Sequence, residues 1–139
     1  MSDYGFSITL TEKFEPVVAR AREALAEQGF GILTEIDVAA TMKAKLDVDL
    51  PPYLILGACN PPLAHQAIGI DASIGLLLPC NVVIRALDER RTLVEVMDPN
   101  VMVSATGNYA LAPVAEQART RLTAALDTLS GPAPVARCV

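Results

Sequence analysis

The sequence predicts an α+β domain of two layers, in which a mostly antiparallel sheet of about five strands carries two long helices on one face. Stretches with apolar residues at every second position alternate with stretches that have apolar residues at helical spacing. Two later strand-like stretches are joined by a short charged turn, which is typical of an antiparallel hairpin. A chain of 139 residues fits one domain. We expect it over residues 1–130, with a flexible tail at 131–139.

The N-terminal part reads as a strand followed by the first long helix. Apolar residues alternate with small or polar ones from Tyr4 to Leu10. We expect Thr11 as the helix N-cap and a regular start near Lys13, because Pro16 is tolerated only in the first helical turn. Gly29 supplies a left-handed stop. The predicted inward face consists of Phe14, Val17, Val18, Ala21 and Leu25.

A second strand and a short helix follow. The strand is expected at Gly31 to Ile36, and Asp37 then caps a helix over residues 38–46. The helix is expected to carry an apolar stripe of Val38, Met42 and Leu46. Residues 47–52 form a loop.

The third strand has an unusual composition. Tyr53 to Cys59 is a nearly continuous apolar run, which suits a strand covered on both faces or lying at the middle of a sheet. Asn60 and Pro61 then have the order of an N-cap and a first helical position, so a short helix is expected over residues 61–68. Gly69 is expected to end it.

The hairpin comes next. Its first strand is expected within residues 76–87, and Pro79 requires that strand to begin after it, to lie at an edge there or to bulge. The sequence "DERR" forms the turn, and residues 92–97 return. Asp98 and Pro99 open a short helix that runs to about Val103, and Gly107 with Asn108 ends it. The last long helix is expected over residues 111–129, with Val114, Ala118, Leu122, Ala125, Leu126 and Leu129 on one face.

Composition and charge exclude several classes of function. The net charge is −5, and aromatic residues make up 4% of the chain with no Trp. No basic stripe is present, which argues against a nucleic-acid partner and against binding at a membrane surface. The longest apolar run is too short and too interrupted to cross a bilayer. The first residues show no secretion signal, so we expect a reducing cytoplasm.

Two Cys-Asn pairs form the candidate site. Cys59 should end one strand and Cys80 should start its antiparallel neighbour, which places both thiols at one end of the sheet. His65, the only histidine, lies within one turn of the helix that starts after Asn60. Free N–H groups at that helix N-terminus would favour a Cys59 thiolate. Asn60 and Asn81 are turn formers in the first place, and they could also line a small polar pocket with the cysteines.

Four interpretations of this region stay open. Cys59 and Cys80 could be small buried hydrophobic residues. With His65 they could bind a soft metal or haem. They could form a reversible disulfide or a sulfenate sensor, in which one thiol resolves the other. Cys59 could be a nucleophile with His65 as its base. His65 also falls off the inward side of its helix, which favours a surface or pocket-rim position.

The chain resembles a known family. The matching segments are "EALAEQGFGILTEIDV", "PPYLILGACNPPLAHQAI" and "IGLLLPCNVVI", with "MDP" and "APVAE" further on. They resemble the family catalogued as domain of unknown function 302 over nearly the whole chain. The resemblance implies a strand, a helix, four further strands and a helix, the TATA-binding-protein-like architecture, often as a homodimer, and it implies no known activity. Asp47 stands where the family is expected to have glycine, and aspartate can adopt the left-handed conformation needed there.

The leading functional hypothesis is therefore a small cytoplasmic domain, expected as a homodimer, that binds a small molecule, metal or redox partner at the end of the sheet where Cys59, His65 and Cys80 lie. The alternative is a non-catalytic structural or protein-interaction module, a homodimer in which both cysteines are core packing. Whether the protein is an enzyme, and which cofactor it uses, is left open by the sequence.

Overall fold

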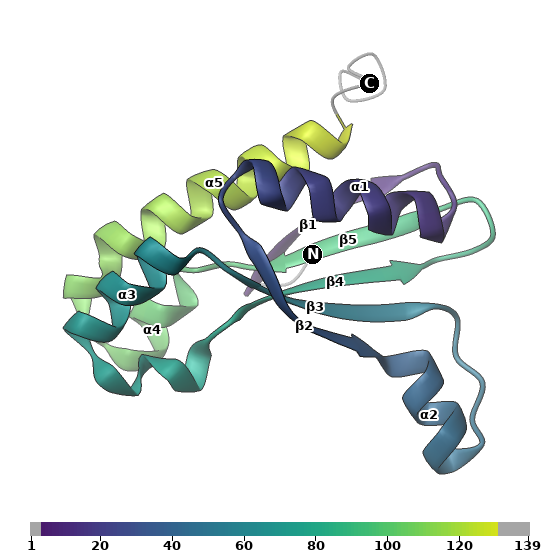
Figure 1. The fold of residues 1–139 in the computed structure, drawn as a ribbon, viewed down its shortest axis with the longest axis horizontal. Helices are drawn as coiled ribbons and strands as arrows, with labels where there is room; N and C mark the ends of the chain where they lie inside the picture. Colours follow the sequence, from purple (N-terminus) through teal and green to yellow (C-terminus); the bar gives the residue numbers. More distant parts are fainter. Residues whose placement is uncertain (1–3, 131–139) are drawn as a thin grey trace.

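A computed structural model describes residues 4–130 and shows a five-stranded antiparallel sheet in the order β1-β5-β4-β3-β2. The predicted fold class and the order strand, helix, four strands, helix are confirmed (Figure 1). The strands are β1 (Gly5–Leu10), β2 (Gly31–Asp37), β3 (Tyr53–Cys59), β4 (Cys80–Ala86) and β5 (Thr92–Met97). The helices are α1 (Phe14–Glu27), α2 (Val38–Leu46), α3 (Pro61–Ile70), α4 (Val101–Thr106) and α5 (Ala112–Ser130), with 3₁₀ helices η1 (Ala72–Leu77) and η2 (Tyr109–Leu111).

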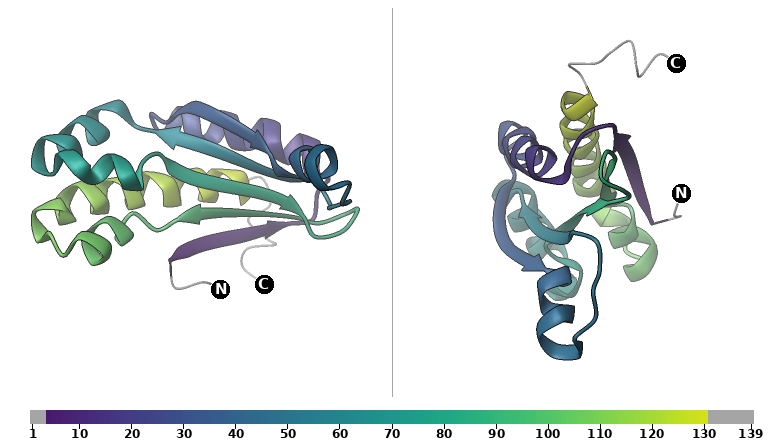
Figure 2. Two further views of the ribbon diagram at one scale, coloured as in Figure 1. Left: turned by 90° about the horizontal axis from the view of Figure 1, so that it is seen from below. Right: turned by 90° about the vertical axis from the view of Figure 1, so that its right-hand side faces the viewer.

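The main core lies between the sheet and the two long helices. Both α1 and α5 lie on the same face of the sheet, side by side (Figures 1 and 2). Every second residue of the central strands points into this layer, as the alternation predicts. The core includes Val17, Ala21 and Leu25 of α1, Leu54 and Leu56 of β3, Val82 and Ile84 of β4, Val94 and Val96 of β5, and Leu122 and Leu126 of α5.

A second, smaller core lies beyond one end of the sheet. It is built by α3, η1, α4 and η2 against the N-terminal half of α5 (Figure 1). Its buried members include Leu63, Ile74, Met102, Leu111 and Val114. This cluster fixes α3, and therefore fixes the start of α3 against the ends of β3 and β4.

At the opposite end, α2 projects away from the body (Figure 1). The end-on view in Figure 2 shows that it lies on the side of the sheet opposite to α1 and α5. Asp37 caps it as predicted, by accepting a hydrogen bond from the Ala40 N–H at 2.9 Å. Asp47 ends it in the left-handed conformation, with φ 54°. None of its residues is buried, so the predicted apolar stripe has no core to pack on.

Several expected boundaries are wrong. The N-cap of α1 is Lys13 and not Thr11, and no side chain caps that helix. Helix α3 continues through Gly69 to Ile70, because a glycine inside a helix costs only about 1 kcal/mol and the next cap comes at Asp71. Helix α4 begins at Val101, two residues later than its proline-containing start suggested.

The start of the hairpin also differs from expectation. Residues 72–77 form η1 where part of a strand was expected, and β4 begins at Cys80, directly after Pro79. Of the three possibilities for Pro79, a strand that begins after it is therefore confirmed. The bounds of β3 and β5 agree with prediction, as does the buried face of α5. The proposed tail at residues 131–139 lies outside the described residues.

Candidate functional site

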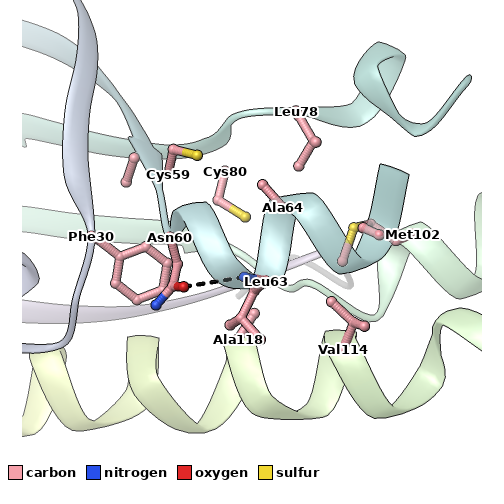
Figure 3. A pocket seen from close by; sticks show the side chains of 12 residues that line it. Phe30, Cys59, Asn60, Leu63, Ala64, Leu78, Cys80, Met102, Val114 and Ala118 are labelled. Carbon is pink, nitrogen blue, oxygen red and sulfur yellow. Dashed lines mark hydrogen bonds between the residues drawn. The ribbon is translucent and has the colours of Figure 1, made fainter. Parts of the chain in front are cut away.

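The pairing of β3 with β4 brings the two cysteines to the same end of the sheet. Ala58 is the cross-strand partner of Cys80, so Cys59 lies one residue beyond that pair. Both thiols are free, Cys80 is buried and Cys59 is half-buried. Figure 3 shows both side chains beside the first turn of α3. The predicted proximity of the two strand ends is therefore present in the structure.

The two cysteines line a small, mostly apolar cavity. Its volume is about 20 Å³, which is room for about one water molecule. Asn60 contributes the polar part of the lining, and the apolar part includes Phe30, Leu63, Ala64, Leu78 and Met102 (Figure 3). A cavity of this size does not hold an organic ligand, whose pockets usually measure about 300–1,000 Å³.

Asn60 has a structural role at this site. It is 8% exposed, and its Oδ1 accepts a hydrogen bond from the Leu63 N–H at 3.3 Å. Its Nδ2 donates to the carbonyl oxygen of Gln28 at 3.5 Å, which ties the start of α3 to the end of α1. Both ends of the amide are therefore engaged within the protein. Asn60 is a helix cap here, and it does not present a free polar group to a ligand.

The start of α3 offers no free N–H to a thiolate, contrary to expectation. Pro61 and Pro62 occupy the first two helical positions and have no N–H. The Leu63 N–H is bonded to the Asn60 side chain, and the Ala64 N–H is bonded to the Asn60 carbonyl oxygen at 2.9 Å. The groups that would have stabilised a negative sulfur on Cys59 are absent or already engaged. This removes the physical argument for an activated Cys59.

Cys80 is held in its protonated form. Burial raises the pKa of its thiol to about 11, and the nearby Cys59 adds to this shift by disfavouring a second negative charge. A thiol in this state is a poor nucleophile at neutral pH, because the thiolate is the reactive species. The environment of Cys80 is that of a packing residue.

His65 does not join the cysteines. It lies on the exposed side of α3, while the buried positions of that helix are Leu63 and Ala67. No group of three or more His, Cys, Asp and Glu side chains within residues 4–130 is placed to hold a metal ion. The hypothesis of a metal site built from Cys59, Cys80 and His65 therefore has no geometric support. Ile68 of the same helix is also exposed, at 47%.

Asn81 lies apart from Asn60. Because Cys80 points into the core, strand alternation turns Asn81 to the opposite face of the sheet, where it is exposed. There it lines an open hollow of about 330 Å³ together with Tyr4, Tyr53, Val83, Glu95 and Met97. The two Cys-Asn pairs therefore do not line one pocket.

No helix of the described chain covers this second face of the sheet (Figures 1 and 2). We call it the uncovered face and define it by its apolar residues Ile36, Tyr53, Ile55, Val83, Leu93 and Met97. Ile36, Ile55 and Val83 are successive cross-strand partners and form an apolar row across β2, β3 and β4. Ile36 is 48% exposed, and the other five are half-buried. Arg85 and Glu95 form an ion pair beside this row, at 3.4 Å.

Sequence reasoning did not single out the uncovered face as a candidate site, although a signal for it was present. The continuous apolar run of β3 predicted a strand covered on both faces. Within the described residues only one of its faces is covered, the one that carries Leu54, Leu56 and Ala58. Tyr53 and Ile55 remain on the uncovered face.

The fold, the cysteine cavity and the uncovered face define a small two-layer α+β domain. No helix within residues 4–130 is long and apolar enough to cross a membrane. The chain belongs to the family described as domain of unknown function DUF302, whose model matches residues 6–129. It is similar to the crystal structure of an uncharacterized conserved DUF302 protein from Bacillus stearothermophilus, with 26% identity and a TM-score of 0.84. That similarity covers 92% of this chain and 99% of the other. No curated protein matches the sequence.

Proposed function

We propose that the protein is a non-catalytic interaction module that forms a homodimer through the uncovered face. The observation that carries this proposal is the apolar row of Ile36, Ile55 and Val83, which residues 4–130 leave partly in contact with water. Burying one valine or isoleucine side chain contributes roughly 1.5–3 kcal/mol. In a twofold dimer each residue of the face is buried in both copies, so its contribution to the free energy of association is made twice. Such a surface therefore has a strong tendency to pair with a second copy.

The state of the cysteines supports a module without thiol chemistry. The cavity between them has room for about one water molecule, Cys80 is buried and protonated, and α3 presents no free N–H to Cys59. In this proposal the two thiols are packing residues at the junction of the two cores.

A second candidate function is binding of a small molecule on the same face. The hollow of about 330 Å³ beside Asn81 is in the size range of small-ligand pockets, and Tyr4 and Tyr53 flank it. Native mass spectrometry of the gently purified protein tests this candidate directly. A co-purifying small molecule that is lost in Asn81→Ala would favour it, and bare protein would count against it.

Light scattering coupled to size-exclusion chromatography tests the dimer. The wild type should have twice the chain mass of 14.7 kDa, and Val83→Glu should have the mass of one chain. Thr120→Glu is the matched control, because it places the same charge on an exposed position of α5 on the other side of the molecule. Circular dichroism establishes that each variant is folded. A wild type of single-chain mass at 100 μM, or a Val83→Glu dimer, would reject the proposal.

A further inference from the structure

We propose that α2 and the loop after it, residues 47–52, act as an arm that closes over the uncovered face of a second copy. This inference rests on the proposed homodimer and specifies its architecture. The arm is defined as residues 38–52.

Helix α2 is short and only partly packed. It has nine residues and none of them is buried, although it is capped by Asp37 and ended by Asp47. Isolated helices shorter than about 12–15 residues are marginal in water, and most helices in proteins are stabilised by packing of an apolar face. The first half of α2 is half-buried next to β3, at Val38, Ala39, Thr41 and Met42, while residues 43–46 are exposed. The second half of this well-capped helix therefore lacks the packing that normally maintains a short helix.

Exposed apolar side chains are concentrated along the arm. Leu46 is 66% exposed, Val48 44% and Leu50 41%. Single exposed apolar residues are common on protein surfaces, but several within one short segment mark an interaction site. Three of the four charged residues of the arm are engaged with one another, because Lys43 pairs with Asp47 at 2.9 Å and with Asp49 at 3.2 Å. The apolar side chains are left for a partner.

The arm projects from the end of the sheet toward the side opposite to α1 and α5 (Figure 2), and it begins two residues after Ile36 of the uncovered face. Leu50 lines a hollow with Tyr53, Arg85 and Glu95 of that face, and it also lines a second hollow that reaches Phe14 of α1. A second copy that packs face to face brings its own uncovered face next to this arm. Twofold symmetry then applies the same contact twice.

The area of the uncovered face, compared with the area that a stable dimer interface needs, fits a second copy as the occupant. Five strands spaced by about 4.8 Å and six residues long at about 3.3 Å each give a face of roughly 24 by 20 Å, or about 480 Å² in projection. A stable interface buries about 800 Å² per partner. The face supplies a large part of that area, and the arm supplies apolar surface beside it that brings the interface toward the required size.

The experiment combines limited proteolysis with an arm variant. Trypsin cleavage after Lys43 and Lys45 should be at least tenfold slower in the wild-type dimer than in the Val83→Glu monomer, because the partner holds α2 folded. Cleavage in the exposed 88–91 turn serves as the internal reference. Leu46→Glu should raise the dimer dissociation constant at least tenfold, and Ala44→Glu, on the opposite side of α2, should leave it within about twofold.

The possible results distinguish the role of the arm from the homodimer on which it rests. One outcome would reject the role of the arm and keep the homodimer. In that outcome Val83→Glu dissociates the wild-type dimer, but trypsin cuts the arm as fast in the dimer as in the monomer. Leu46→Glu then also leaves the dimer dissociation constant unchanged. A wild type of single-chain mass overturns both. Protection of Lys43 and Lys45 together with weaker dimerisation of Leu46→Glu establishes the arm.

Discussion

Cys80 should react with a thiol reagent far more slowly than an ordinary cysteine. Its pKa of about 11 lies about two units above the usual value of 9.0. At pH 8 the thiolate then amounts to roughly 0.1% of the molecules instead of roughly 10%, so ionisation alone slows the reaction about 100-fold. Burial of the sulfur slows it further, because the reagent reaches it only when the structure opens.

The assay uses a Cys59→Ser/Cys138→Ser variant, in which Cys80 is the single thiol. A chromogenic disulfide reagent measures its rate between pH 7 and pH 10, in buffer and in denaturant. Burial, the larger cause of the raised pKa, remains in this variant, so we expect the denatured chain to react at least about 100-fold faster than the folded chain at pH 8, from ionisation and restricted access together. The companion Cys80→Ser/Cys138→Ser variant reports on Cys59. Folded and denatured rates for Cys80 that agree within threefold would refute the packing role assigned to this thiol.

The same pKa predicts that Cys80 makes stability depend on pH. The contribution of the protonated Cys80 thiol to the free energy of unfolding is fully present below pH 9, where the unfolded thiol is also protonated. It is lost as the pH rises toward 11, by roughly 3 kcal/mol in all. Urea unfolding at pH 8 and pH 10.5 measures the loss, and a Cys80→Ala variant with the same pH dependence would contradict it. Asn60→Ala should cost about 1–2 kcal/mol, because it removes the cap on the Leu63 N–H, and Asn60→Asp should recover part of that cost; equal losses in the two variants would show that the cap is unimportant. Gly57→Ala should cost about 1–3 kcal/mol, because the new methyl group would overlap Thr34 Oγ1, and adding Thr34→Ala should relieve part of the strain in the same unfolding assay, whereas additive losses would count against this explanation.

Much of the fold could be predicted, because its elements follow strict periods. The alternation in β5 and the helical spacing of α5 each reflect one buried face, so their bounds and buried sides followed from the apolar pattern. The apolar run before Pro79 carried no such period. It packs as η1 with Ile74 buried and Leu76 88% exposed, an arrangement set by the second core and not by local preference.

The candidate site was predicted in part. Chain order placed Cys59 and Cys80 at one end of neighbouring strands, and the structure confirms that placement. The expectation of free N–H groups beside Cys59 was wrong, and the sequence itself contained the reason, because Pro61 and Pro62 cannot donate hydrogen bonds. The separation of Asn81 from Asn60 also follows from strand alternation once Cys80 is known to point inward. How deeply Cys80 is buried could be determined only from the packed structure.

The uncovered face was not predictable as a site, because an apolar run does not reveal which chain covers it. Tyr53 and Ile55 have the composition of core residues, and the pattern indicated cover on both sides of β3. The two long helices supply only one layer. The cover for the other face has to come from outside the described chain, and we propose that it comes from a second copy.

Sedimentation velocity of the wild-type protein over a dilution series tests this central claim most directly. The account predicts a species of twice 14.7 kDa at micromolar concentration, which dissociates to single chains on dilution without unfolding. A single species of 14.7 kDa at every concentration up to 100 μM would contradict it.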